Sequence, residues 1–528
     1  MVEVLAQIST KRAQDISKKG FGFGYEIPQE RIHPLVQPRF EPMLFIAEIK
    51  RASPSAGEIG AIPSPTKLAG DYLNGGAGAI SVLCEEQHFN GSLLDLMAVK
   101  NAFPNACVLR KDFIQYPQEI AISYRAGADM ILLISAMFID EKEGFARFQA
   151  IYEECLQYGI TPLIEVHTQR EIDFIAPLAP KLVGINARNL HTFEIDIPTA
   201  CVLKDALPNS EVIFESAINS PSSAFMVGSF GFSGLLCGSY LVSHHNPTHA
   251  LQSLKSAFML GKTEQPRFYR HIFPTLNAQN STDSKPLLKI CGITNLDDAL
   301  TLAQEGAKEK TTNNQNPQDS IKCNAIDMFG FILVPHSPRY IESKRIKEIA
   351  KALQKLYPHI LRIAVVNDDK NALNEAKTLY QQGYIDAIQL HGLNPSAPHT
   401  FANTSLKEAL FCFYGVQNIA RADDFNPSYE GAFCLVDSKS AQGGGSGKHI
   451  NLEVLRSLKE QYLCVAGGIN PHNIADFLQL RPALLDVNSG IESAAGKKDR
   501  DKFRLLLSHL NASISSQNKI KPQKSTQL

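Results

Sequence analysis

Residues 44–55 read LFIAEIKRASPS, an apolar run that ends in charged residues. In a β-strand, successive side chains point to opposite faces of the sheet. Ile46, Glu48 and Lys50 therefore share one face of this strand, and the residues between them share the other. A strand that is buried on both faces is expected to stay apolar to its end. The carboxylate and the ammonium that end this strand on one face therefore need an explanation other than packing.

Short apolar runs recur through the first half of the chain at intervals of roughly 20 to 35 residues, which suits strands alternating with helices around a parallel sheet. The segments between them, such as residues 140–159, have the apolar spacing of helices and often end in glycine. Eight such units fit one (β/α)8 barrel of about 250 residues. We predict this barrel over residues 1–262, with a helical extension before its first strand. The eight runs are FIAEIK, ISVLC, CVLRKD, ILLIS, PLIEV, LVGIN, VIFES and GLLCG.

The pattern stops at residues 263–285, a polar, proline-containing stretch that predicts a linker. It then resumes, and a second barrel is predicted over residues 286–512. The insertion at 308–324 is poor in apolar residues and predicts a mobile surface loop, and residues 513–528 predict a disordered tail. The fold class is therefore α/β, two tandem (β/α)8 TIM barrels; a doubly wound sheet is the alternative for either half, but the number of units favours barrels. The second set of runs is LLKICGI, MFGFILV, RIAVVN, AIQLHG, LFCFYG, FCLVDS, LCVAGG and LLDVNSG.

The composition excludes several classes of function. The chain has 528 residues, 44% of them hydrophobic and 20% charged, with a formal net charge of -1, which is typical of a soluble globular protein. Such a balance argues against nucleic acid or an anionic membrane as the main partner. The ten cysteines form no C-x-x-C pair and have no metal-like spacing with histidine. With no signal-peptide core and no apolar run of membrane-spanning length, we expect a reduced, cytoplasmic protein.

Polar side chains end several strands of the predicted first barrel. Side chains of barrel strands alternate between the interior and the surrounding helices, and active sites form at the carboxyl ends of the strands. Any one such residue is more often part of a structural ion pair, but burying several charges without a function or complete pairing is too unfavourable. A Gly-Ser pair, Gly238 and Ser239, follows the eighth strand and offers backbone amides to a phosphate. The polar strand-end residues after Glu48 and Lys50 are Lys111, Glu165, Asn186, Arg188 and Glu215.

The second predicted barrel has a comparable set. Cys291 follows its first strand and Asp437 ends its sixth. Loops rich in glycine and serine follow strands six, seven and eight, where backbone amides can hold a phosphate. The alternatives are a flexible linker for the first loop and an inert core thiol for Cys291. The loop residues singled out are Gly445, Gly447, Gly467, Gly468, Ser489 and Gly490.

The motifs of the two halves resemble two enzyme families. In the first half IAEIKRASPSAGEI, ISVLCEEQHFNGS, LRKDFI, LIEVH, VGINARNL, FESAI and CGSYLV resemble indole-3-glycerol phosphate synthase. In the second half KICGIT, FILVPHSPRYI, QLHG, LVDS, GGGSGK, AGGI and DVNSGIE resemble phosphoribosylanthranilate isomerase. The resemblance spans roughly residues 5–510, in family order, and fusion of the two is a known bacterial arrangement of the tryptophan pathway.

The isomerase resemblance implies an Amadori rearrangement of phosphoribosylanthranilate to an open-chain ketose phosphate. Asp437 would be the general acid on the ring oxygen and Cys291 the general base on the C2 proton, since a carboxyl donates a proton and a thiolate removes one. Arg339 would bind the anthranilate carboxylate through a planar fork.

The synthase resemblance implies ring closure of that ketose phosphate, loss of carbon dioxide and loss of water to form the indole. Lys111 would be the general acid at the carbonyl, and Lys50 would bind the substrate carboxylate; the division of labour between the two lysines stays open. Neither half calls for a metal or an organic cofactor, and the partners are phosphorylated anthranilate sugars. The remaining residues of the implied site are Glu48, Glu165, Asn186 and Glu215 for catalysis, and Ser53, Arg188, Ser216, Gly238 and Ser239 for substrate binding.

Three positions depart from the family patterns. Ala217 stands where the synthases usually have glycine, next to the expected phosphate site, and its methyl group can alter the approach of the backbone. The isomerase loop continues into Ile450-Asn451 instead of Phe-Asp, although Asn is a competent helix cap. The run FCFYGV lacks the Lys-Ala of many isomerases.

Two rival interpretations remain. A sugar-phosphate isomerase of the histidine pathway is expected to use paired aspartates at strands one and five, which this chain lacks. A protein in which one barrel only binds phosphate ligands is disfavoured by the intact charged residues, though Ala217 keeps it open for the first half. We expect a monomer, because each domain already has a partner surface.

Overall fold

A computed structural model describes residues 3–53, 57–60, 62, 64–189, 194–278, 285–308, 324–427, 431, 433–438, 450–458 and 462–519. The chain divides into two compact units between Gln265 and Pro266.

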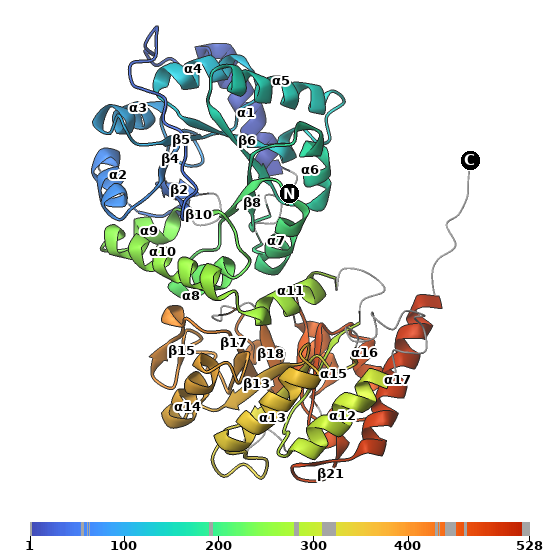
Figure 1. Cartoon of the computed structure of the whole chain (residues 1–528). Coiled ribbons are helices and arrows are strands. Elements are labelled where there is room, and N and C mark those ends of the chain that lie inside the picture. The colour runs from blue at the N-terminus through green and yellow to red at the C-terminus, as the bar shows by residue number, and fades with distance from the viewer. Residues whose placement is uncertain are drawn as a thin grey trace, which may run out of the picture. The chain divides into compact units, whose positions relative to one another are not determined.

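The first unit is a closed barrel of eight parallel strands (Figure 1). The ring runs β1-β10-β9-β8-β7-β6-β5-β4, so that each strand pairs with its neighbours in sequence and the last strand pairs with the first. The first of the eight is the opening stretch of the sequence, whose register places Glu48 opposite Ser81. The strands are β1 Leu44–Ile49, β4 Ala79–Leu83, β5 Val108–Lys111, β6 Met130–Ile134, β7 Thr161–Val166, β8 Leu182–Asn186, β9 Glu211–Glu215 and β10 Gly234–Cys237.

Helices surround this ring of strands (Figure 1). Several begin where the sequence offers a cap: Ser64 and Ser220 each accept a backbone N–H and are followed by proline in the first turn. The helices are α2 Pro65–Asn74, α3 Leu93–Ala102, α4 Gln118–Ala126, α5 Gly144–Gln157, α6 Gln169–Ile175, α7 Ile197–Leu203, α8 Pro221–Gly228, α9 Ser239–Ser243 and α10 Pro247–Glu264. A short hairpin, β2 Ala52–Ser53 with β3 Gly57–Glu58, follows β1.

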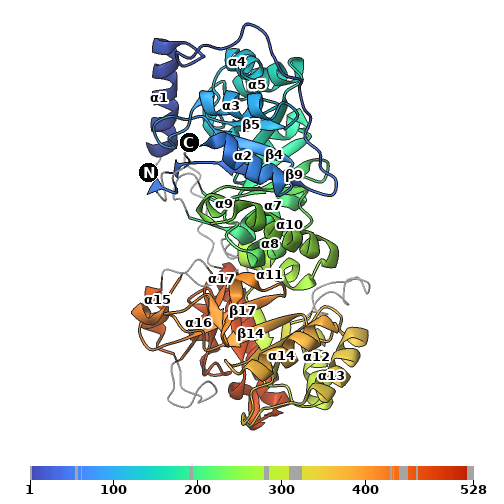
Figure 2. The same ribbon diagram turned by 90° about the vertical axis from the view of Figure 1, so that its left-hand side faces the viewer.

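The predicted N-terminal extension is helix α1, Glu3–Lys19, which lies beside the first barrel (Figure 2). Leu5 and Ile8 join a buried cluster with barrel residues such as Leu109. Arg12 forms a buried ion pair with Asp112, the residue that follows β5. The extension is therefore tied by both apolar and charged contacts to the strand that ends in Lys111.

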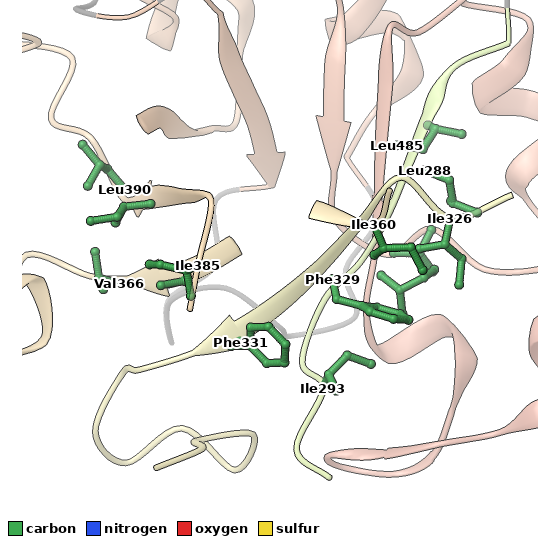
Figure 3. Close-up of a cluster of buried hydrophobic side chains, with 14 of the residues drawn as sticks. Leu288, Ile293, Ile326, Phe329, Phe331, Ile360, Val366, Ile385, Leu390 and Leu485 are labelled. Carbon is green, nitrogen blue, oxygen red and sulfur yellow. The ribbon is translucent and has the colours of Figure 1, made fainter. Parts of the chain in front are cut away.

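The second unit is also a closed barrel of eight parallel strands, in the order β11-β12-β13-β14-β17-β18-β19-β20. Figure 3 shows part of the core between its strands and helices, where Leu288, Phe329 and Phe331 are buried. The strands are β11 Leu287–Ile290, β12 Met328–Ile332, β13 Leu361–Val366, β14 Ala387–His391, β17 Phe413–Ile419, β18 Cys434–Ser438, β19 Cys464–Ala466 and β20 Leu484–Val487. The helices are α11 Arg267–Ala278, α12 Leu296–Lys308, α13 Ser343–Leu356, α14 Lys370–Gln381, α15 Leu452–Ser457, α16 Ile474–Leu478 and α17 Arg500–Lys519. The prediction of two tandem barrels is confirmed, and the doubly wound sheet is wrong for both units.

The stretch predicted as a linker is mostly structured. Residues 267–278 form helix α11, in which Phe268 and Tyr269 are buried. The ring of Phe268 stacks on Tyr414 of β17, with centroids 5.8 Å apart and an interplanar angle of 6°. Tyr414 lies at the start of its strand, so α11 covers the amino-terminal end of the second barrel. The polar residues and prolines of this stretch made it look like a linker, although its apolar residues are spaced to form one face of a helix. The helix includes Pro274.

Helix α17 likewise continues to Lys519, into the tail predicted to be disordered. Residues 309–323 of the predicted mobile insertion lie outside the described residues, as do Gly445 and Gly447 of the glycine-rich loop. None of the helices in the described part of the chain is long and apolar enough to cross a membrane.

Candidate active sites

Three charged side chains from different strands meet at the carboxyl end of the first barrel. Lys111 ends β5, Glu165 lies near the end of β7 and Glu215 ends β9. The Lys111 Nζ lies 2.7 Å from Glu165 Oε2 and 2.8 Å from Glu215 Oε2. Both carboxylates are buried. One ammonium thus bridges two carboxylates that are far apart in sequence.

The environment separates the proton affinities of these groups. Burial lowers the pKa of Lys111, but attraction to Glu165 and Glu215 outweighs it and raises the pKa. Burial also raises the pKa of Glu165, yet Lys111 and His167 together bring it well below its usual range. For Glu215, burial raises the pKa to about 7, because the attraction of Lys111 is offset by repulsion from Glu165. The environment therefore favours the charged form of Lys111 and the ionised form of Glu165, and it favours the protonated form of Glu215 relative to a free carboxyl.

The two charges that end the opening stretch are paired with each other. Lys50 Nζ lies 2.7 Å from Glu48 Oε1. A Cβ atom built on Gly238 would lie 2.7 Å from the same oxygen, so glycine after β10 gives the Glu48 carboxylate its room. The Ser81 hydroxyl of β4 donates to Glu48 Oε2 at 3.5 Å.

Asn186 at the end of β8 organises a further part of this rim. Its Oδ1 accepts the Ser216 hydroxyl at 2.7 Å and the Arg188 backbone N–H at 3.0 Å. The backbone of Arg188 pairs with that of Ile195 in an isolated antiparallel β-bridge. Burial lowers the pKa of the Arg188 guanidinium. Ser53 lies in the hairpin after β1, and Ser239 begins the short helix α9 next to Gly238.

The loop after β9 has an unusual backbone. Ser216 has φ +69° and Ala217 has φ +59°, both in the left-handed region. Glycine adopts this region at no steric penalty, whereas Ala does so at a disadvantage. The departure noted at Ala217 therefore falls on a residue whose conformation favours the family's glycine.

In the second barrel Cys291 lies beside a buried ion pair. Lys289, two residues earlier on the same face of β11, has its Nζ 2.6 Å from Asp486 Oδ2 of β20 and also contacts Gln389. A Cβ on Gly330 would lie 2.8 Å from Cys291 Sγ and 3.0 Å from Lys289 Cε, so the thiol and the lysine border the same small space. Burial raises the pKa of the Cys291 thiol, with Lys289 acting in the opposite direction.

Asp437 near the end of β18 is held by neighbouring loops. Its Oδ1 accepts the Ser438 backbone N–H at 2.7 Å, and its Oδ2 lies 3.4 Å from His391 Nε2 of β14. A Cβ on Gly467 would lie 2.6 Å from Asp437 Oδ1. Gly467 has φ +95° and Gly468 has φ +68°, so this turn requires glycine for its backbone as well as for space.

Arg339 is oriented by Glu492. Its Nε lies 2.9 Å from Glu492 Oε1 and its Nη2 lies 2.7 Å from Oε2, and Lys498 Nζ pairs with Glu492 Oε1 at 3.0 Å. The carboxylate thus occupies the side of the guanidinium formed by Nε and Nη2. A planar guanidinium has a second fork, formed by Nη1 and Nη2, which suits another carboxylate. Ser489 and Gly490 begin the 3-10 turn η7, Ser489–Ile491, just before Glu492.

Sequence reasoning missed three residues of these sites: His167, Lys289 and Glu492. The signal was present for the first two, since each lies two positions from a predicted site residue, and side chains at that spacing in an extended chain point to the same side. Glu492 ends the motif DVNSGIE, but nothing local indicates its role, because its partner Arg339 is 153 residues away. Within the described ranges, no group of three or more His, Cys, Asp or Glu side chains is arranged to hold a metal ion.

Comparison with known proteins divides the chain in the same way as the fold. The family model described as indole-3-glycerol phosphate synthase matches residues 6–254, and that described as N-(5'-phosphoribosyl)anthranilate isomerase matches residues 307–509. The second match includes Arg339 and Asp437 but begins after Cys291. Among solved structures, the phosphoribosyl anthranilate isomerase of Thermus thermophilus is 27% identical, covering 43% of this chain and 98% of its own, with a TM-score of 0.34.

Curated relatives contain both halves or the first alone. The multifunctional tryptophan biosynthesis proteins of Schizosaccharomyces pombe and Phycomyces blakesleeanus are both 28% identical, over 88% and 87% of this chain. The chain spans 58% and 61% of their lengths. The indole-3-glycerol phosphate synthase of Mycolicibacterium gilvum is 40% identical over 40% of this chain and 76% of its own length. The chain thus belongs to the indole-3-glycerol phosphate synthase family, and its second unit carries a phosphoribosylanthranilate isomerase domain.

Proposed function

We propose that this chain catalyses two consecutive steps of tryptophan biosynthesis. The second barrel isomerises N-(5-phosphoribosyl)anthranilate to 1-(2-carboxyphenylamino)-1-deoxyribulose 5-phosphate. The first barrel converts that product to indole-3-glycerol phosphate, carbon dioxide and water. The observation that carries the proposal is the Lys111 ammonium between two buried carboxylates at the carboxyl end of the barrel that matches the synthase model.

In the isomerase step Asp437 protonates the furanose ring oxygen, and the ring opens to an iminium. Cys291, as the thiolate, then removes the C2 proton, and the enolamine tautomerises to the ketose. Arg339 holds the anthranilate carboxylate with the fork that Glu492 leaves open. The phosphate is held by the loops after strands six to eight, with Gly445, Gly447, Gly467, Gly468, Ser489 and Gly490.

In the synthase step the aromatic carbon that bears the carboxylate attacks the ketose carbonyl while Lys111 delivers a proton to the carbonyl oxygen. Loss of carbon dioxide restores the aromatic ring, and loss of the protonated hydroxyl as water gives the indole. The raised pKa of Lys111 keeps it in the protonated form that a general acid needs. Lys50 binds the substrate carboxylate, and Glu48, Glu165 and Glu215 stabilise positive charge or accept protons. Asn186 completes the catalytic set, and the substrate is held by Ser53, Arg188, Ser216, Gly238 and Ser239.

The test is to give the purified chain only phosphoribosylanthranilate and to identify products over time. Indole-3-glycerol phosphate with released carbon dioxide is the expected result. Accumulation of the ketose phosphate would refute the synthase assignment and support the alternative in which the first barrel only binds its ligand. Unconsumed substrate would refute the isomerase assignment, and the synthase would then be tested with the ketose supplied directly.

We place this enzyme in the cytoplasm as a monomer that does not act on nucleic acid or membranes. Nine cysteines lie in the described part of the chain, and all are buried, which agrees with small apolar side chains in a reducing compartment. Sedimentation of the purified chain at micromolar concentration tests the oligomeric state.

A further inference from the structure

His167 in the first barrel is a buried ring that the proposed mechanism does not use. It follows β7, and its side chain is 8% exposed. Its Nδ1 lies 3.1 Å from Glu171 Oε2, and its Nε2 lies 3.3 Å from Glu165 Oε1, without the alignment of a regular hydrogen bond. Both ring nitrogens therefore face carboxylate oxygens.

This arrangement determines which form of the ring fits. An ionised carboxylate only accepts hydrogen bonds, and a neutral imidazole has just one N–H to donate. Neutral His167 would direct a nitrogen lone pair at Glu165 or at Glu171. The imidazolium form, with a proton on each nitrogen, faces both carboxylates favourably. The same two carboxylates raise the pKa of His167 to about 9 against the effect of burial.

Glu171 is a fixed anchor for this ring. It lies in the first turn of α6, where its Oε1 accepts the Thr168 hydroxyl at 3.0 Å. Its Oε2 accepts the Ser135 hydroxyl at 2.8 Å and the His167 backbone N–H at 3.1 Å. The ring is thus held from the helix side, and its other edge is directed at Glu165.

The charged groups around His167 form an alternating row that crosses the site. Glu171 comes from α6, Glu165 from β7, Lys111 from β5 and Glu215 from β9, and His167 is the residue that follows β7. Glu165 has a cation on each oxygen, with Lys111 at Oε2 and His167 at Oε1. Of these two cations, only Lys111 pairs with Glu215. The two carboxylates on Lys111 are therefore not equivalent.

We propose that His167 is a positioning residue of the synthase site: its imidazolium holds Glu165 ionised and oriented, and so leaves Glu215 as the carboxyl that carries the exchangeable proton. This inference rests on the proposed synthase function of the first barrel. It gives the pair of glutamates distinct roles, with Glu165 as a fixed negative charge and Glu215 as the proton-exchanging group.

One test reads the ring directly and needs no activity. In the full chain, selectively labelled with ¹⁵N-histidine, the His167 ring signals are assigned by their loss in His167→Asn and followed with pH. We expect the imidazolium from pH 6 to pH 8. A neutral tautomer at pH 7 would overturn the proposal, whether or not the chain has synthase activity.

The second test compares two neutral replacements, His167→Gln and His167→Asn. Each removes the charge, and the Gln amide can still donate to Glu165. Loss of the second cation raises the pKa of Glu165, so the acidic limb of the synthase kcat/KM profile should move up by about one pH unit in both variants. The ketose phosphate is supplied directly, and survival of the first barrel as a fragment in limited proteolysis shows that the unit containing His167 is folded.

The outcomes separate charge from packing. An unshifted profile in His167→Gln would overturn the proposal, because a hydrogen bond without charge would then suffice. Equal losses at every pH in both variants would also overturn it, since they indicate a structural role only. Failure of the unaltered chain to convert the ketose would instead refute the proposed synthase function, and the ring titration would still decide the state of His167.

Discussion

Replacing Ala217 with glycine should stabilise the first barrel. Ala217 has φ +59°, and a non-glycine residue in the left-handed region costs about 1–2 kcal/mol. Glycine removes that strain. It also raises the conformational entropy of the unfolded chain, which cancels about 0.4–1 kcal/mol of the gain in stability. The expected net gain in the free energy of unfolding is on the order of 0.5–1 kcal/mol. With a urea m-value of about 3 kcal/mol/M for a domain of this size, the unfolding midpoint should rise by roughly 0.2–0.3 M.

Pulse proteolysis in urea measures this change barrel by barrel. An unfolded barrel is digested while a folded one survives as a fragment, so the two midpoints are read separately in one chain. Gly231→Ala is the matched control, because Gly231 has φ +72° with no atom within 4 Å of an added Cβ. It should lower the midpoint of the first barrel by a similar amount. A midpoint that falls or stays unchanged in Ala217→Gly, with the control behaving as expected, would refute the strain argument.

Three further predictions concern the two sites. Lys111→Met should abolish formation of indole-3-glycerol phosphate and leave the isomerase rate unchanged, as measured by chromatography of the products; normal indole formation would show that another group is the acid. Because burial raises the pKa of Cys291 and a base must be deprotonated, isomerase kcat/KM should increase with pH through the alkaline range, and a profile that is flat there would exclude the thiolate. Glu492→Gln should raise the KM for phosphoribosylanthranilate by about tenfold with a smaller change in kcat, since loss of the charged partner lets the Arg339 fork rotate; steady-state kinetics measure this, and an unchanged KM would mean that Arg339 is positioned without Glu492.

Both barrels could be predicted from the sequence because their signals are local. Each strand is an apolar run, each helix has its own periodicity, and all sixteen predicted runs match barrel strands. The segments predicted wrongly are those where local composition misleads. The composition of residues 267–278 is typical of a linker, and the helix α11 is explained only by the burial of Phe268 and Tyr269 against the end of the second barrel.

The sequence by itself determined the fold class, the family and the residue types at the strand ends, because alternation within one strand places Glu48 and Lys50 on the inner face. Only the tertiary structure decided which of these charges meet. Lys111 reaches carboxylates 54 and 104 residues away, and no local pattern specifies such a pairing. The same holds for His167, whose charge depends on what lies at each edge of its ring. Proton affinities are set by burial and by neighbours in space, and those exist only once the barrel has closed.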